Sequence, residues 1–370
     1  MKIGILTLPL LDNYGGILQD YALQRTLQTY GGGNNVWLIQ RKKPQVYNRK
    51  QLLFYYIKRI LKPIIKKEFK FTGREIDKFV NKYFPCKSPF LLSTEDLRKY
   101  VADSGFDGIV VGSDQVWRQC YTPEIRDYFL GMCEDNHSIK RVAYAASFGV
   151  DEWEFTEEET ADCKRLASLF DYISVREKSA VDLCRQYLDV NATHVLDPTM
   201  LLQKDEYIDL IKEWKEPQSS GDLFYYILDR NDSKTALINK MSEQTGLEPF
   251  STYPRLSPTI MNLIRFPKYC IFPRVTQWLR AFQDARMVIT DSFHGCIFSI
   301  IFNVPFWVVG NASRGNARFD SLLQLFHLEN RLIDVSAENV DYNEPIDWES
   351  VNRIRNEMIV KSKAAFSYLC

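Results

Sequence analysis

The chain has 370 residues, 45% of them hydrophobic and 25% charged, which is the composition of a globular protein with an apolar core. At roughly 150 residues per domain, this length suggests two domains, and the composition excludes a disordered chain, a collagen-like repeat and a disulfide miniprotein. Lys plus Arg and Asp plus Glu both number 47, so no overall charge would draw the chain to nucleic acid.

Neither the cysteines nor the apolar runs indicate a metal or a membrane span. None of the eight cysteines has a CxxC or CxxH spacing, which predicts reduced thiols and no structural zinc. Residues 3–11 lack a signal-peptide cleavage site, so they predict a buried first strand. The longest apolar run, 296–309, is interrupted by Ser299 and Pro305 and is too polar to cross a bilayer. We therefore expect a cytoplasmic protein with no bound cofactor.

Short apolar runs alternate with helical patterns through the first half of the chain. Residues 13–16 predict a loop and residues 17–30 a helix. The predicted strands are 3–7, 36–40, 108–111, 141–146, 172–175 and 194–196. Strands that alternate with helices indicate βαβ units and a parallel sheet.

The same alternation restarts after Asp197-Pro198. The predicted helices are 204–214, 233–244, 276–284 and one from about Gly295, and the predicted strands are 223–228, 286–290 and 305–309. Residues 348–368 predict a long amphipathic helix, and 215–221 is the most linker-like stretch. We therefore expect an α/β protein with two Rossmann-like doubly wound domains, 1–205 and 206–345, facing a central cleft, and a C-terminal helix, 346–370.

A strong charge asymmetry lies between residues 41 and 70. This stretch contains eleven Lys or Arg and a single acid, Glu68, interleaved with Leu, Ile, Phe and Tyr. We interpret it as a basic amphipathic insertion in the first domain. Two interpretations stay open: contact with an anionic membrane surface, or packing of its apolar face on the core.

In open α/β sheets, ligands bind at the carboxyl ends of the strands, so loops that directly follow strands are the candidate sites. Asn13, Gly15 and Gly16 follow the first strand and precede a helix, where glycines allow close approach and helix amides favour an anion. The pattern is not GxGxxG, so a dinucleotide fingerprint is absent. A plain turn is the alternative.

The fully apolar strand 108–111 runs into Gly112, Ser113, Asp114 and Gln115. A turn glycine followed by three polar residues suits ligand contact. Asp114 could accept a hydrogen bond from a sugar hydroxyl or act as a base, and the alternative is a cap of a helix or turn.

Arginines follow two further strands. Arg176 lies at the end of strand 172–175, and its planar guanidinium suits a phosphate or carboxylate. Arg314 and Arg318 flank a glycine after strand 305–309, an arrangement typical of an anion clamp. For all three, the alternative is a solvated surface charge.

The loop 290–295, Thr-Asp-Ser-Phe-His-Gly, carries the sharpest signal. His294 follows an apolar strand and precedes an apolar helix, which places it in the predicted cleft. A helix N-terminus lowers the pKa of a His unless a bound anion restores it. A structural His is the alternative.

In order and spacing, these motifs resemble the polysaccharide pyruvyl transferase family. The resemblance spans residues 2–335 and rests on NYGGILQDYAL (13–23), GSDQVW (112–117), ISVREKS (173–179), DP (197–198), TDSFHG (290–295), NVPFWVV (303–309) and NARFDSLL (316–323). It implies a fold like the GT-B glycosyltransferases. It also implies transfer of the pyruvyl group of phosphoenolpyruvate onto two hydroxyls of a sugar, in synthesis of bacterial capsular, extracellular or cell-surface polysaccharide.

By this resemblance, Arg176 and His294 bind phosphoenolpyruvate and take part in catalysis. Many members have an Arg two residues before this His, where the chain has Ser292. We expect Ser292, with Arg176, Arg314 and Arg318, to bind the donor. Arg318 or Arg314 would meet the charge that the missing Arg meets in other members; a different donor is the alternative.

The implied chemistry assigns a role to each candidate. His294 would protonate the donor's methylene carbon, and Arg176 and Arg318 would clamp its carboxylate and phosphate. Asp114 would orient or deprotonate the acceptor. The expected acceptor contacts are Asn13, Gly15, Gly16, Ser113 and Gln115. No metal is required, and a lipid-diphosphate-linked sugar would give the basic insertion a purpose at the inner face of the membrane.

Two other functions stay open. One is a nucleotide-sugar glycosyltransferase, although residues 294–310 contain no Asp or Glu to hold ribose hydroxyls. The other is a non-catalytic sugar-binding protein on the same fold.

Overall fold

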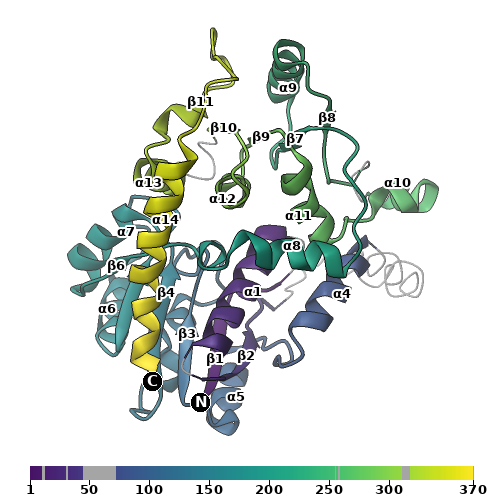
Figure 1. Ribbon diagram of the computed structural model, residues 1–370. Helices are drawn as coiled ribbons and strands as arrows, with labels where there is room; N and C mark the ends of the chain where they lie inside the picture. Colours follow the sequence, from purple (N-terminus) through teal and green to yellow (C-terminus); the bar gives the residue numbers. More distant parts are fainter. Residues whose placement is uncertain are drawn as a thin grey trace.

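The computed structural model describes residues 1–10, 13–30, 32–44, 72–254, 256, 259–310 and 317–369. Its strands form two sheets, the first at the bottom of Figure 1 and the second at the top, with helices around both. All strand pairings are parallel. The βαβ units predicted for both halves of the chain are therefore present.

The first sheet has six strands in the order β2-β1-β3-β4-β5-β6. All four residues of β3 are buried, as expected for a parallel strand covered by helices on both faces. The strands are β1 (Lys2–Thr7), β2 (Asn35–Gln40), β3 (Gly108–Val111), β4 (Lys140–Ala146), β5 (Tyr172–Val175) and β6 (Thr193–His194). Their α-helices are α1 (Tyr14–Thr29), α4 (Arg74–Tyr83), α5 (Thr94–Ser104), α6 (Glu157–Ala167) and α7 (Lys178–Leu183).

The second sheet has five strands in the order β11-β10-β9-β7-β8. Its strands are β7 (Leu223–Tyr226), β8 (Pro249–Phe250), β9 (Met287–Thr290), β10 (Phe306–Val309) and β11 (Leu332–Ile333). The α-helices of this part are α8 (Lys204–Glu213), α9 (Asp232–Thr245), α10 (Ile260–Arg265), α11 (Val275–Asp284), α12 (Phe293–Phe302) and α13 (Ala317–Phe326).

Helix α1 begins earlier than predicted. The side chain of Asn13 caps it by accepting a hydrogen bond from the backbone N–H of Gly16 at 3.3 Å. This cap draws Gly15 and Gly16 into the first helical turn, whereas the sequence predicted a loop there.

The end of the chain returns to the first sheet. Helix α14 (Trp348–Lys363) continues as a 3₁₀ helix, Ala364–Leu369, and runs down the molecule in yellow in Figure 1. Phe366 stacks on Tyr144 of β4 with 4.8 Å between ring centroids, and Tyr368 stacks on Tyr172 of β5 at 4.7 Å. Because α14 also packs against α13 (Ala317–Phe326), the last helix contacts both parts of the molecule.

One apolar core cluster continues from the first sheet into the second. Tyr14 of α1 stacks on Trp278 of α11 at 5.9 Å, and its hydroxyl donates to the carbonyl of Pro273 at 2.9 Å. In the stretch predicted as a linker, Glu216 is buried and accepts a hydrogen bond from Thr276 at 2.6 Å. The connection between the sheets is thus anchored to α11.

Most of the basic insertion lies outside the described residues. Its first residue, Arg41, is buried and forms an ion pair with Asp127 at 2.7 Å, so this charge belongs to the core. Within the described ranges, no helix combines the length and the apolar composition needed to cross a membrane.

Candidate active site

Arg176 lies at the centre of a buried group of charges at the carboxyl ends of the first sheet's strands. It directly follows β5, and its residue is 4% exposed. One terminal nitrogen, Nη1, donates to Gln19 Oε1 at 3.0 Å and to Asp197 Oδ2 at 2.9 Å. The other, Nη2, donates to Asp114 Oδ1 at 3.3 Å. One guanidinium thus holds together α1 and the loops after β3 and β6.

His294 reaches this group from the second domain. It is in the first turn of α12, and its Nε2 lies 3.2 Å from Gln19 Oε1 and 3.6 Å from Asp197 Oδ2. Because an amide oxygen only accepts, the contact with Gln19 assigns the proton to Nε2. Ser292 caps α12 by accepting from the N–H of Gly295 at 3.4 Å, so its side chain shapes the helix start.

Gly15 is the point where α1 and α12 meet. A Cβ added at Gly15 would lie 2.2 Å from Cγ of His294, well inside van der Waals contact. The absence of a side chain there lets the imidazole lie directly against the backbone of α1. Gly15 therefore contacts His294, whereas the sequence suggested an acceptor contact.

Both carboxyl groups bonded to Arg176 are held ionised. Burial alone would raise the pKa of Asp197, but His294 and Arg176 lower it well below its usual value. For Asp114, burial again opposes ionisation, while the positive charges of Arg176, His294 and Arg318 lower the pKa. Asp114 has a left-handed φ of 68°, and its side chain is 13% exposed.

A second guanidinium lies close to Arg176. Arg318, in the first turn of α13, lies 5.5 Å from the ring centroid of Phe293, and Arg176 lies 4.7 Å from the same centroid. Burial and the repulsion from Arg176 lower the pKa of Arg318 to about 10. Two buried positive charges that repel each other favour the binding of an anion near them.

A cavity of about 410 Å³ adjoins this cluster, which is large enough for a sugar ring. Asp114 and Gln19 line this cavity and also accept hydrogen bonds from Arg176. Its other walls come from the loop after β1, the start of α1 and Tyr121. The lining residues are Thr7, Leu8, Pro9, Leu10, Asn13, Gly16, Ile17, Gln19, Asp20, Asp114 and Tyr121.

The structure brings Arg176, His294, Asp114 and Arg318 together, with Asn13 and Gly16 at the cavity. It places two other candidates away from it. Ser113 is fully buried and donates its hydroxyl to the carbonyl of Ala145 at 3.0 Å. Gln115 accepts a hydrogen bond from Arg118 at 3.3 Å and packs against Gly149. Arg314 lies outside the described residues.

Four further residues lie in the site although no role was predicted for them from the sequence: Gln19, Asp20, Asp197 and Phe293. Asp197 directly follows the predicted strand 194–196, which is the signal used for the other loops. Gln19 and Asp20 are two adjacent polar residues inside an otherwise apolar stretch of α1, and both are buried. Among the described residues, no set of three or more His, Cys, Asp or Glu side chains is arranged to hold a metal ion.

Comparison with known proteins gives one family match. Residues 13–313 match the family model for polysaccharide pyruvyl transferase. This range contains the candidate loops that supply Arg176 and His294 and ends before α13. No curated protein matches the chain.

Solved structures resemble the whole chain at low sequence identity. The UDP-GlcNAc 2-epimerase of Neisseria meningitidis bound to UDP-GlcNAc has a TM-score of 0.51 and 11% identity, over 98% of this chain and 100% of that one. Two others have a TM-score of 0.49. They are the Methanocaldococcus jannaschii UDP-GlcNAc 2-epimerase, at 12% identity over 97% and 93% of the two chains, and Medicago truncatula UGT71G1, at 11% over 100% and 98%. With the two parallel sheets, the similarity to the Neisseria meningitidis structure confirms the predicted two-domain α/β, GT-B-like fold.

Proposed function

Because the chain belongs to the polysaccharide pyruvyl transferase family, we propose that it transfers the pyruvyl group of phosphoenolpyruvate to two hydroxyls of a sugar. The product would be a pyruvate ketal on a bacterial capsular, extracellular or cell-surface polysaccharide, or on its precursor. The observation that carries this proposal is the pair of buried guanidiniums, Arg176 and Arg318, next to His294 and a sugar-sized cavity.

The two arginines suit a donor with two anionic groups. Phosphoenolpyruvate presents a carboxylate and a phosphate on one small molecule, and guanidinium forks bind both kinds of group. Binding such an anion would relieve the repulsion that lowers the pKa of Arg318. Arg318 thereby supplies the charge that Ser292 does not.

The first half of the reaction moves one proton to the donor and one from the acceptor. His294 gives its proton to the methylene carbon, and the C2 centre becomes electrophilic. One sugar hydroxyl adds to C2, and its proton passes to the carboxylate of Asp114, which lies at the cavity and is kept ionised by its cationic neighbours. The bond that forms is C2–O, and a tetrahedral intermediate still carrying phosphate results.

We place the acceptor sugar in the cavity. Asn13 and Gly16 contribute polar backbone and side-chain groups there, and Leu8, Leu10 and Ile17 contribute apolar surface for a ring face. The outer wall contains Tyr121, which is 42% exposed.

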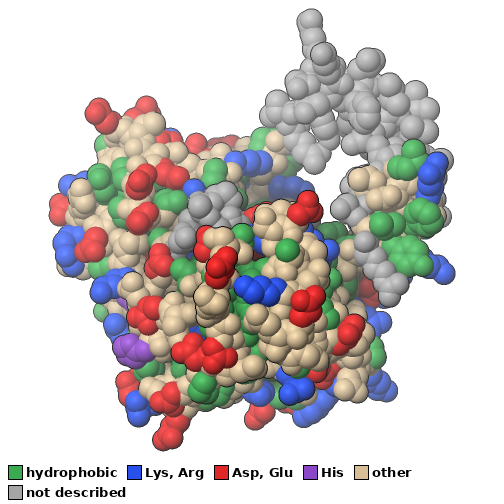
Figure 2. Space-filling view, turned by 90° about the horizontal axis from the view of Figure 1, so that it is seen from above, with side chains coloured by type: hydrophobic (Ala, Val, Ile, Leu, Met, Phe, Trp, Pro, Cys, Tyr) green, Lys and Arg blue, Asp and Glu red, His purple; other side chains and the backbone are tan. Residues whose placement is uncertain are grey.

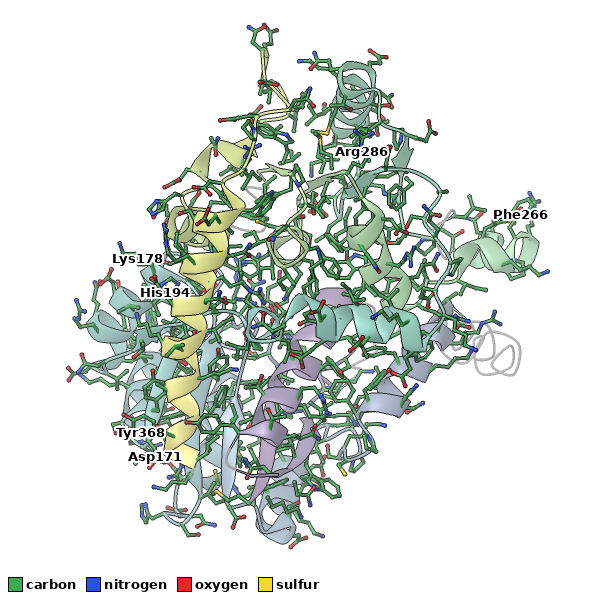
Figure 3. All side chains as sticks on the ribbon, in the orientation of Figure 1. Asp171, Lys178, His194, Phe266, Arg286 and Tyr368 are labelled. Carbon is green, nitrogen blue, oxygen red and sulfur yellow. The ribbon has the colours of Figure 1, made fainter. Side chains whose placement is uncertain are left out.

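A peripheral membrane contact is part of the proposal, since a lipid-diphosphate-linked acceptor would require one. Figure 2 shows hydrophobic and basic side chains gathered on the projecting part at the right, and Figure 3 places Phe266 there. In this projection, Met261, Phe266 and Tyr269 are 56%, 48% and 46% exposed, and Arg265 and Lys268 are exposed beside them. The Phe272 N–H, just after the projection, donates to the carbonyl of Thr72, which follows the basic insertion in the sequence.

Vesicle sedimentation tests this contact. Charge reversal in Arg265→Glu and Lys268→Glu should reduce partitioning onto vesicles containing phosphatidylglycerol, since each basic residue near an anionic surface contributes about 1 kcal/mol. The matched control is Arg98→Glu, an exposed residue on α5. Equal partitioning of the wild type, the Arg265→Glu/Lys268→Glu double variant and the control would contradict a membrane role for the projection.

Thermal melting with phosphoenolpyruvate or UDP-GlcNAc tests the donor. A ligand at about 100 times its Kd adds about 2.7 kcal/mol, a shift of a few degrees in a chain of this size. We expect the shift with phosphoenolpyruvate, its loss in Arg318→Gln and its retention in the exposed control Arg98→Gln. A shift with UDP-GlcNAc alone would contradict the proposal and favour a glycosyltransferase.

A further inference from the structure

Asp20 is a carboxyl group at the cavity to which the first half of the proposed reaction gives no role. It lies in the second turn of α1 and is 1% exposed, yet it lines the cavity together with Asp114 and Gln19. The side chain of Thr7, at the end of β1, forms a hydrogen bond with the carboxyl group. The Oδ1 oxygen of Asp20 has no geometrically well-formed hydrogen bond within the described residues.

The surroundings of Asp20 differ from those of the two neighbouring carboxylates. Asp114 and Asp197 each pair with Arg176, but the described part of the chain gives Asp20 no ion pair. Burial raises the pKa of Asp20 well above its usual value, and the negative charges of Asp114 and Asp197 act in the same direction. The phenol of Tyr128 is a further titratable group near it. Neighbouring carboxyl groups with opposite shifts are a basis for separate acid and base roles.

The stoichiometry of ketal formation requires two proton transfers to the donor. Two hydroxyl protons leave the sugar; one ends on the methyl carbon and the other on phosphate. His294 and Asp114 account for the first hydroxyl. The second half, in which phosphate departs and the second hydroxyl attacks, needs another acid.

We propose that Asp20 is that acid, and this inference depends on the pyruvyl transfer proposed above. As the bond between C2 and the phosphate oxygen breaks, its electron pair goes to that oxygen, which takes the proton of Asp20. The second hydroxyl then forms its bond to C2, and its proton passes to the Asp20 carboxylate. The acid is thereby restored, and phosphate leaves with one proton. Asp114 returns its proton to His294 through solvent.

The test compares two donors, one whose leaving group must be protonated as it departs and one whose leaving group departs without a proton. Phosphoenolpyruvate releases phosphate, whereas sulfoenolpyruvate releases sulfate, a leaving group that departs unprotonated. Asp20→Asn keeps the size of the side chain and a polar contact for Thr7 but cannot donate the carboxylic proton. Turnover is measured as phosphate or sulfate release with a panel of p-nitrophenyl hexosides as acceptors. The control is Asp77→Asn, an exposed change on α4.

We expect Asp20→Asn to lose about 10²-fold in turnover with phosphoenolpyruvate, which is typical for removal of a general acid. With sulfoenolpyruvate, the loss should shrink by at least about tenfold if proton donation is the missing step. An equal loss with both donors, or no loss with either, would overturn the role of Asp20. Wild-type protein that releases neither anion with any acceptor would overturn the proposed function itself. Circular dichroism melting of Asp20→Asn shows whether the variant is folded.

Discussion

Two buried charge clusters in this molecule are built in opposite ways. Lys234 and Asp291 form an ion pair at 2.6 Å, and Asp291 also accepts hydrogen bonds from the backbone N–H groups of Leu228 and Asp229 at 2.6 and 3.1 Å. This Lys234 pair has one charge of each sign, and its carboxylate oxygens have partners. The cluster around Arg176 also contains ion pairs, of Arg176 with Asp114 and Asp197, but it adds a second guanidinium, that of Arg318, and a cavity-lining acid with a raised pKa, Asp20.

The difference shows that burial of a charge alone does not identify a site. A structural pair satisfies its own charges, whereas a site keeps charge and hydrogen-bonding capacity for a ligand. Asp291, just after β9, and His294, in the first turn of α12, are three residues apart in sequence, yet they belong to different clusters. Asp291 therefore has a structural role in this segment, and His294 has the proposed catalytic role.

The largest expected effect on stability comes from removing Lys234 from its ion pair with Asp291. Lys234→Met leaves Asp291 as an uncompensated buried charge, and loss of one partner of such a pair lowers the free energy of unfolding by about 3–5 kcal/mol. Urea denaturation measures this loss, and the Kd for phosphoenolpyruvate should not change at temperatures where the variant is folded. Weaker donor binding without lost stability would make the Lys234 pair part of the site.

His294→Gln tests the other residue of the same segment. If His294 is the general acid, turnover should fall by about 10²-fold or more. The free energy of unfolding should change by less than about 1 kcal/mol, since Gln is polar and of similar length. Phosphate release and urea denaturation of the same sample give the two quantities. A large loss of stability with an unchanged turnover number of the folded fraction would make His294 structural.

Asp20→Asn should change the free energy of unfolding only slightly, and it should raise it, whereas Lys234→Met lowers it. The native pKa of Asp20 is raised, so above the usual aspartate pKa of about 3.9 the unfolded chain releases a proton that the native protein retains. Wild-type stability therefore falls as pH rises from about 4 toward the native pKa of Asp20. The variant lacks this loss, so its advantage over wild type should be larger at pH 7 than at pH 4. Urea denaturation at both pH values measures it, and a pH-independent difference would contradict a protonated Asp20.

Much of the fold could be predicted from hydrophobic pattern. Buried parallel strands such as β3 and β9 are continuous apolar runs, so their positions and the restart of the βαβ pattern follow from the sequence. The start of α1 was predicted too late because the cap by Asn13 overrides the preference of glycine for loops. The return of residues 364–369 to the first sheet depends on tertiary contacts such as Phe366 with Tyr144.

The candidate site was less predictable, because adjacent residues in a turn point in different directions. Ser113, Asp114 and Gln115 are consecutive, but of these three side chains only that of Asp114 contacts Arg176. The left-handed φ of Asp114 changes the direction of the backbone, so its neighbours point elsewhere. Asp20 lies inside a helix, where no strand end marks it. Its position depends on which face of α1 packs toward β1. Hydrophobic periodicity does not reveal that face, because α1 is buried on almost all sides.

Because Gly15 of the first domain contacts His294 of the second, the position of the imidazole depends on how the two domains are placed relative to each other. Gln19 belongs to the first domain and His294 to the second, and their hydrogen bond crosses the domain boundary. Separation of the two domains would break the contacts of His294 Nε2 with Gln19 and Asp197, together with the stacking of Tyr14 on Trp278. The imidazole would then lose the partners that fix its proton and orientation. The proton that we propose His294 to donate is therefore positioned by two residues of the other domain, Gln19 and Asp197.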